Sequence, residues 1–138
     1  MEIQIDSKRL KIGEHRVKYS AYYFDVEEYN DLSEAAALKE ILVQWAGALS
    51  NLDNGRALFL PFSLDDEWIE CFKASQSGER ITLKYVWVSE GGWSVDVSDL
   101  GEFMTSEHEI RKELPGVFGE YQKEDLVLAL LNARVVGA

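Results

Sequence analysis

The chain has 138 residues, 46% of them hydrophobic and 12% aromatic, which is enough to bury one core and too few for two ordinary domains. Asp and Glu number 25 against 14 Lys and Arg, so the formal net charge is −11. Binding to nucleic acid or to anionic lipid depends on positive charge, so we expect no nucleic-acid or membrane partner.

Short strands are expected at the beginning of the chain. Apolar and polar residues alternate in brief stretches over residues 2–24, where Ile3 and Ile5 are followed by Leu10 and Ile12. Gly13 then separates these from a further alternating stretch that includes Val17. This pattern is typical of strands joined by tight turns.

A helix is expected after Ser33, which is a good N-cap residue. The Asn and Gly residues of 51–55 favour its end, because they tolerate the left-handed backbone conformation found there. Five apolar residues at spacings of three and four form the stripe of an amphipathic helix: Leu38, Ile41, Leu42, Trp45 and Leu49.

The middle of the chain predicts an antiparallel meander. Strands are expected over 57–62, 68–74 and 80–90, and a further one over 93–98 after the Gly91-Gly92 turn. In the third of these, one face is the natural core side because it carries Ile81, Leu83, Tyr85 and Trp87.

Two helices are expected near the end of the chain, a short one over 106–114 and a longer one over 124–134. Strands with helices at intervals indicate one α+β domain over residues 1–138. We expect an antiparallel sheet, a meander of at least four strands, with helices packed on one face.

No catalytic, metal or cofactor motif is found. His15 and His108 are too few for a histidine-rich metal site, and neither has the His-Glu-x-x-His spacing. Cys71 lies beside Glu70 in an expected strand, which favours a buried structural thiol. Nucleophile elbows, phosphate loops and dinucleotide fingerprints are absent from the sequence. We therefore expect no enzyme activity, no cofactor and no metal.

The abundant carboxylates do not by themselves indicate catalysis. Paired acids could hydrolyse glycosides, but 25 acids place carboxylates side by side without any such role. Residues 96–102 resemble a calcium loop only superficially, because the acid at the third position and the closing Glu are missing.

The expected compartment is the cytoplasm. The N-terminus lacks the basic start and apolar run of a signal peptide, and no stretch approaches the roughly 20 apolar residues that cross a bilayer. The single cysteine, Cys71, cannot form an internal disulfide, which fits a reducing environment.

Charge is unevenly distributed along the chain. Residues 1–18 carry five bases and three acids, a sum of +2, so residues 19–138 carry −13. A compact domain with this charge attracts cationic partners and speeds their association. Solubility alone is an equally good explanation of the charge at this point.

A family resemblance is found in two segments. Residues 58–68, which include Leu60-Pro61-Phe62 before Asp65 and Asp66, and residues 86–95 around Gly91-Gly92 resemble small acidic immunity proteins of bacterial polymorphic-toxin and contact-dependent inhibition systems. The resemblance implies a non-enzymatic protein that binds and neutralises a cognate toxin, commonly a nuclease with a basic surface.

We therefore expect an immunity or inhibitor protein with an acidic binding surface. One alternative is a small-molecule-binding or enzymatic domain with a pocket of Trp68, Trp87 and Trp93 rimmed by carboxylates. Another is a nucleic-acid mimic that blocks a DNA-binding enzyme. The expected partner-binding residues lie at strand ends and loops: Asp65, Asp66, Glu67, Trp68, Glu90, Trp93, Asp96 and Asp99.

Overall fold

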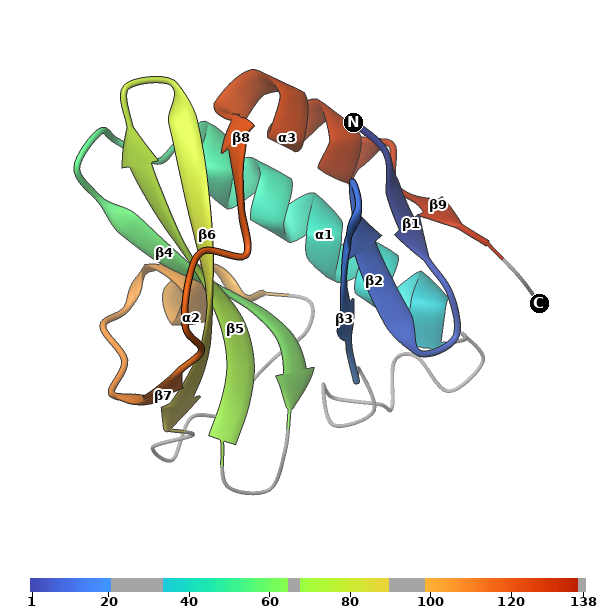
Figure 1. Cartoon of the computed structure of the whole chain (residues 1–138), viewed down its shortest axis with the longest axis horizontal. Helices are drawn as coiled ribbons and strands as arrows, with labels where there is room; N and C mark the ends of the chain where they lie inside the picture. Colours follow the sequence, from blue (N-terminus) through green and yellow to red (C-terminus); the bar gives the residue numbers. More distant parts are fainter. Residues whose placement is uncertain (21–33, 65–67, 90–98, 137–138) are drawn as a thin grey trace.

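The computed structural model describes residues 1–20, 34–64, 68–89 and 99–136 (Figure 1). These residues form an α+β fold, as the sequence predicts, but with two open sheets where one is expected. In chain order the elements are β1 (Ile3–Ile5), β2 (Arg9–Ile12), β3 (His15–Lys18), α1 (Glu34–Ser50), β4 (Ala57–Leu64), β5 (Trp68–Ser77), β6 (Arg80–Ser89), α2 (Gly101–Thr105), β7 (Ile110–Glu113), β8 (Gly119–Gln122), α3 (Lys123–Leu131) and β9 (Arg134–Val135).

The larger sheet, sheet B, has the strand order β4-β5-β6-β7, and β8 also pairs with β6. All of its pairings are antiparallel, so the expected meander of at least four strands is confirmed. The β5–β6 hairpin turns at Gly78, whose φ of 60° is a left-handed conformation that suits glycine. A β-bulge between Pro61 and Ser63 shifts the register of β4 against β5.

The smaller sheet, sheet A, has the order β3-β2-β1-β9 and lies at the right of Figure 1. Strands β1, β2 and β3 pair antiparallel, whereas β9 returns from the end of the chain to pair parallel with β1. The two sheets meet where Ser20 bridges Ser63 of β4.

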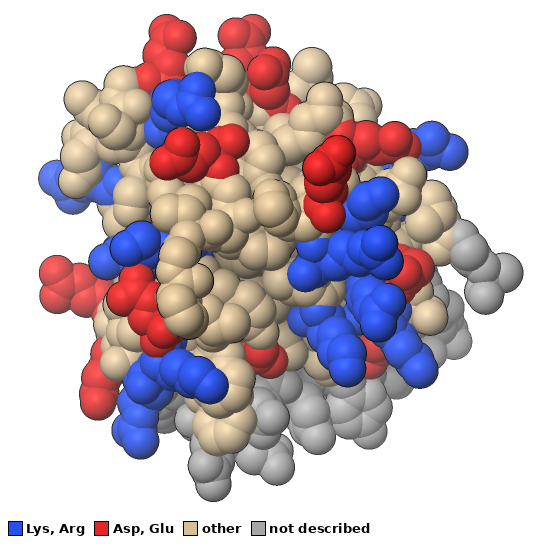
Figure 2. Space-filling model, in the orientation of Figure 1, with Lys and Arg blue, Asp and Glu red and all other residues tan. Residues whose placement is uncertain are grey.

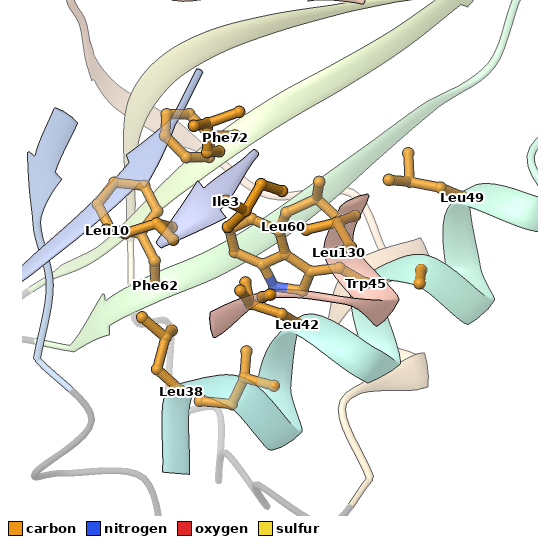
Figure 3. Packing of buried hydrophobic residues seen from close by; sticks show 14 of the residues in the cluster. Ile3, Leu10, Leu38, Leu42, Trp45, Leu49, Leu60, Phe62, Phe72 and Leu130 are labelled. Atoms are coloured by element: carbon orange, nitrogen blue, oxygen red, sulfur yellow. The ribbon is translucent and has the colours of Figure 1, made fainter. Parts of the chain in front are cut away.

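A continuous hydrophobic core joins the two sheets through α1. The predicted helical stripe is confirmed, because Leu38, Ile41, Leu42, Trp45 and Leu49 are all fully buried. Figure 3 shows Trp45 among Leu42, Leu60 and Leu130, which come from α1, β4 and α3. The Trp45 indole N–H donates a hydrogen bond to the Pro61 carbonyl at 3.2 Å, so burial leaves this polar group satisfied.

The opposite face of sheet B is also buried in part. Val86 and Val88, which the alternation of β6 places away from the main core, form a second cluster with Ile69, Cys71 and Phe103. Phe103 belongs to α2, so this short helix supplies the cover that the two valines require.

The helix predicted over 106–114 is wrong. Residues 110–113 instead form β7, which pairs with Val86, Trp87 and Val88 of β6. The helix propensity of this segment does not decide its structure, because β7 forms backbone hydrogen bonds with the edge of β6. The strand predicted over 93–98 and the Ser33 cap lie outside the described residues.

Candidate protein-binding surface

One of the predicted partner-binding residues, Trp68, begins β5 and is partly exposed. Its ring stacks on Trp87 of β6, with centroids 4.9 Å apart and ring planes within 5° of parallel. The contact is diagonal across two strands, because Trp68 pairs with Ser89 while Trp87 pairs with Glu70. Strand register therefore builds an aromatic platform at this end of sheet B.

Polar groups flank the platform on the same face. The Tyr85 hydroxyl donates a hydrogen bond to the Glu70 carboxylate, and burial together with this carboxylate raises the pKa of Tyr85 well above its usual value. On the other side, Lys112 of β7 places its Nζ 4.7 Å from the centroid of the Trp87 ring. We call Trp68, Glu70, Tyr85, Trp87 and Lys112 the tryptophan row.

The tryptophan row was only partly predictable. Trp68 was expected in the binding surface and Trp87 in the alternative pocket, whereas no pattern in the sequence indicated Glu70, Tyr85 or Lys112 for such a site. The register between neighbouring strands brings these residues together. This register is known only once the β5–β6 hairpin and the β6–β7 pairing are known.

Most of the predicted acids are close in sequence to residues at this end of sheet B. Asp65, Asp66, Glu67, Glu90, Trp93 and Asp96 lie outside the described residues. The segments 21–33, 65–67 and 90–98 hold nine of the 25 carboxylates and none of the 14 Lys and Arg residues.

The described ends of those segments are close together. Trp68 pairs with Ser89, Leu64 pairs with Ile69, and Ser20 bridges Ser63. Four of the described residues that flank these segments, Ser20, Leu64, Trp68 and Ser89, therefore lie at one end of sheet B, next to the tryptophan row.

Asp99, the remaining predicted residue, belongs to a different part of the structure. It is exposed and lines a groove of about 600 Å³ between α1, α2 and the start of β4, together with Asp53, Arg56 and Leu58. Leu58 pairs with Ala74, six residues along β5 from Trp68, which is about 20 Å at the usual rise of a strand. The structure therefore does not group Asp99 with Trp68.

Cys71 and His108, two residues with potentially reactive side chains, are both withdrawn from solvent at least in part. Cys71 is fully buried in the second cluster, and burial raises the pKa of its thiol, so the reactive thiolate is disfavoured. His108 is half-buried with its ring against Phe59 and Phe103, and its Nε2 lies 2.6 Å from the Phe103 carbonyl oxygen. Burial lowers the pKa of His108, contrary to the solvated, charged imidazole that its acidic neighbours in sequence suggest.

A second groove, of about 670 Å³, runs beside α3 and the end of α1. Leu128 and Leu131 line it and are 60% and 49% exposed, and Glu124 and Asp125 lie at its rim. The α3 stripe that faces the core consists of Leu126, Ala129 and Leu130, which leaves Leu128 and Leu131 toward this groove.

Among the described residues, no three His, Cys, Asp or Glu side chains are arranged to hold a metal ion. No helix in the described ranges is long and apolar enough to cross a membrane. Comparison with protein-family models, with curated proteins and with solved structures finds no significant match for this chain.

Proposed function

We propose that this protein is a non-enzymatic inhibitor, an immunity protein that binds a basic toxin domain in the cytoplasm and covers its substrate-binding surface. The observation that carries the proposal is the separation of charge. Nine carboxylates and no base fall in three segments of the sequence, 21–33, 65–67 and 90–98. Four of the six described residues that flank these segments, Ser20, Leu64, Trp68 and Ser89, lie at the same end of sheet B as the tryptophan row. A charge that served solubility alone would need no such concentration in a few segments of the sequence.

The chemistry of this end suits a cationic protein surface. Clustered carboxylates attract a basic partner and set its orientation, mainly by raising the association rate. Partly exposed aromatic rings then provide contacts that exclude water and slow dissociation. Trp68 is such a ring, and the contact of Lys112 with Trp87 is an example of the cation–π interaction that a partner's Arg or Lys can make with Trp68.

The stacked geometry disfavours the alternative of a ligand pocket between the tryptophans. At a centroid distance of 4.9 Å and nearly parallel planes, Trp68 and Trp87 leave no room for a third ring between them. The row thus supports contact with an external surface better than enclosure of a small molecule.

The test is binding to the toxin domain encoded beside this gene, measured by surface plasmon resonance at low and at physiological ionic strength. We expect tight binding whose association rate falls with salt, together with loss of toxin activity in the complex. The proposal is overturned if no basic toxin domain binds, or if the affinity does not depend on the tryptophan row and the acidic segments.

A further inference from the structure

The outer face of sheet A has the opposite charge to the chain as a whole. Four bases project from it on neighbouring strands, Arg9 and Lys11 on β2 and Arg16 and Lys18 on β3. Their alternation with the buried Leu10, Ile12 and Val17 places all four on the solvent side of the sheet. Figure 2 shows a group of Lys and Arg side chains over this sheet, at the right of the view. We call these four residues the basic face.

Strand register sets these charges directly against one another. Arg9 pairs with Lys18, and Lys11 pairs with Arg16. Like charges at directly opposed positions of antiparallel strands destabilise the pairing, because their side chains are close neighbours. Among the described residues, none of the four forms a salt bridge.

The acids next to sheet A offset the charge of the basic face only in part. Glu2 pairs with Arg134 at 3.1 Å and accepts a hydrogen bond from Gln4. Asp6 accepts hydrogen bonds from the backbone N–H groups of Lys8 and Arg9. These bonds, together with the nearby charges of Arg9 and Arg16, hold the pKa of its carboxyl below the usual value. Glu14 is exposed in the turn between β2 and β3. Three acids thus face six bases on this sheet, in a chain where acids outnumber bases.

We propose that the basic face is a second interaction surface, which binds a carboxylate-rich segment of a protein partner in an extended conformation. Alternate residues of a strand are about 6.7 Å apart, so the bases on β2 and β3 and the acids at every second position of an extended peptide share one spacing. Arg9 and Arg16 can also bind carboxylates in a bidentate manner. This surface is independent of the inhibitor function proposed for the tryptophan row.

The composition of the face favours an acidic peptide over a single-stranded nucleic acid. Proteins that bind single strands without sequence preference combine positive charge with aromatic rings on which bases stack. The outward positions of β1, β2 and β3 carry Gln4 and the four bases but no aromatic ring. At physiological ionic strength charges are screened beyond about 8 Å, so these bases act locally despite the net charge of −11.

The test uses the full chain and a short peptide that alternates Glu with Thr, with binding followed by fluorescence anisotropy at low salt. We expect Arg16→Glu/Lys18→Glu to weaken binding at least about tenfold. The control Lys39→Glu/Arg111→Glu makes the same change in net charge at exposed positions outside the basic face, and it should leave binding within about twofold of wild type.

The thermal unfolding of each variant is measured alongside its binding. In the β3 variant each introduced carboxylate faces a base on β2, so its midpoint of thermal unfolding should be equal to or above that of wild type. Loss of binding by a folded variant supports the proposal. Equal weakening by both variants would show a net-charge effect and overturn it, and so would tighter binding of a single-stranded oligonucleotide of the same charge.

Discussion

The tryptophan row and the basic face are both parts of β-sheets, yet they differ in every property that matters for binding. The tryptophan row has large aromatic rings, and the sequence segments that continue from this end of sheet B have acids as their only charged residues. The basic face has four Lys and Arg side chains and no ring. A net charge of −11 therefore describes neither region. The difference shows that a charged residue can be assigned a role only when its strand and its cross-strand neighbours are known.

The two regions also depend on a common support. The main hydrophobic cluster includes Ile3 and Leu10 from sheet A, Leu42 and Trp45 from α1, and Phe72 from sheet B. Damage to this cluster is expected to affect both regions together. Changes at either surface should leave the other region intact.

The largest effect is expected from Leu42→Ala. Leu42 is fully buried, so truncation leaves a cavity and should lower the free energy of unfolding by about 2–5 kcal/mol. Urea denaturation followed by tryptophan fluorescence measures the change. The neighbouring Val43 is 43% exposed, and Val43→Ala should cost less than about 0.5 kcal/mol. Equal costs at the two positions would contradict the burial described for α1.

The next largest effect concerns Trp68→Ala. If Trp68 is an anchor of the toxin complex, its removal should raise the dissociation rate by about 30-fold or more, which corresponds to at least about 2 kcal/mol of binding free energy. Surface plasmon resonance with the toxin domain measures this rate. Leu128→Ala, at an exposed apolar side chain on α3, is the matched control and should change it by less than about threefold. A similar rise for both variants would place the interface elsewhere.

Sequence periodicity correctly predicted α1, in which a complete stripe of apolar side chains is buried. Leu38, Ile41, Leu42, Trp45 and Leu49 specify α1 because a buried helix needs apolar residues at those spacings. The helix expected over 106–114 fails because the β6 edge needs a hydrogen-bonding partner, which local sequence does not reveal. Division into two sheets was not predicted either, since strands of three or four residues carry little periodicity.

The sequence could predict single residues of the candidate site but not the contacts between them. Trp68 stands out as an aromatic residue at the start of a strand, and it lies where a partner could reach it. The Tyr85–Glu70 hydrogen bond and the Lys112–Trp87 contact depend on pairing between strands. Asp99 was expected in the same binding surface as Trp68, in a group that follows the Gly91-Gly92 turn, but the fold places Asp99 beside α2. The excess of bases in residues 1–18 was visible in the sequence, while the opposition of these bases across β2 and β3 was not.

A smaller effect is expected from Asp65→Lys/Asp66→Lys. Charges near an interface act mainly on the association rate, so the double reversal should slow association with the basic toxin domain by about tenfold at low salt and flatten its dependence on salt. Glu124→Lys/Asp125→Lys is a matched control, because it reverses two adjacent, exposed acids on α3. If both reversals slow association equally, only net charge steers the partner, and the acidic segment 65–67 has no special role.

The smallest effect is a gain in stability from Arg16→Glu alone. The substitution replaces a repulsive pair with Lys11 by an attractive one across β2 and β3, although it gives up the attraction of Arg16 to Asp6. The balance should raise the free energy of unfolding by at most about 0.2–1 kcal/mol. High salt should reduce the gain, because it screens exposed charges. Arg16→Gln separates the two contributions: it removes the repulsion without adding an attraction, so its stability should lie between those of wild type and Arg16→Glu. A loss of stability in both variants would mean that Arg16 contributes a favourable contact that outweighs its repulsion with Lys11, and the basic face would then carry no strain for an acidic partner to relieve.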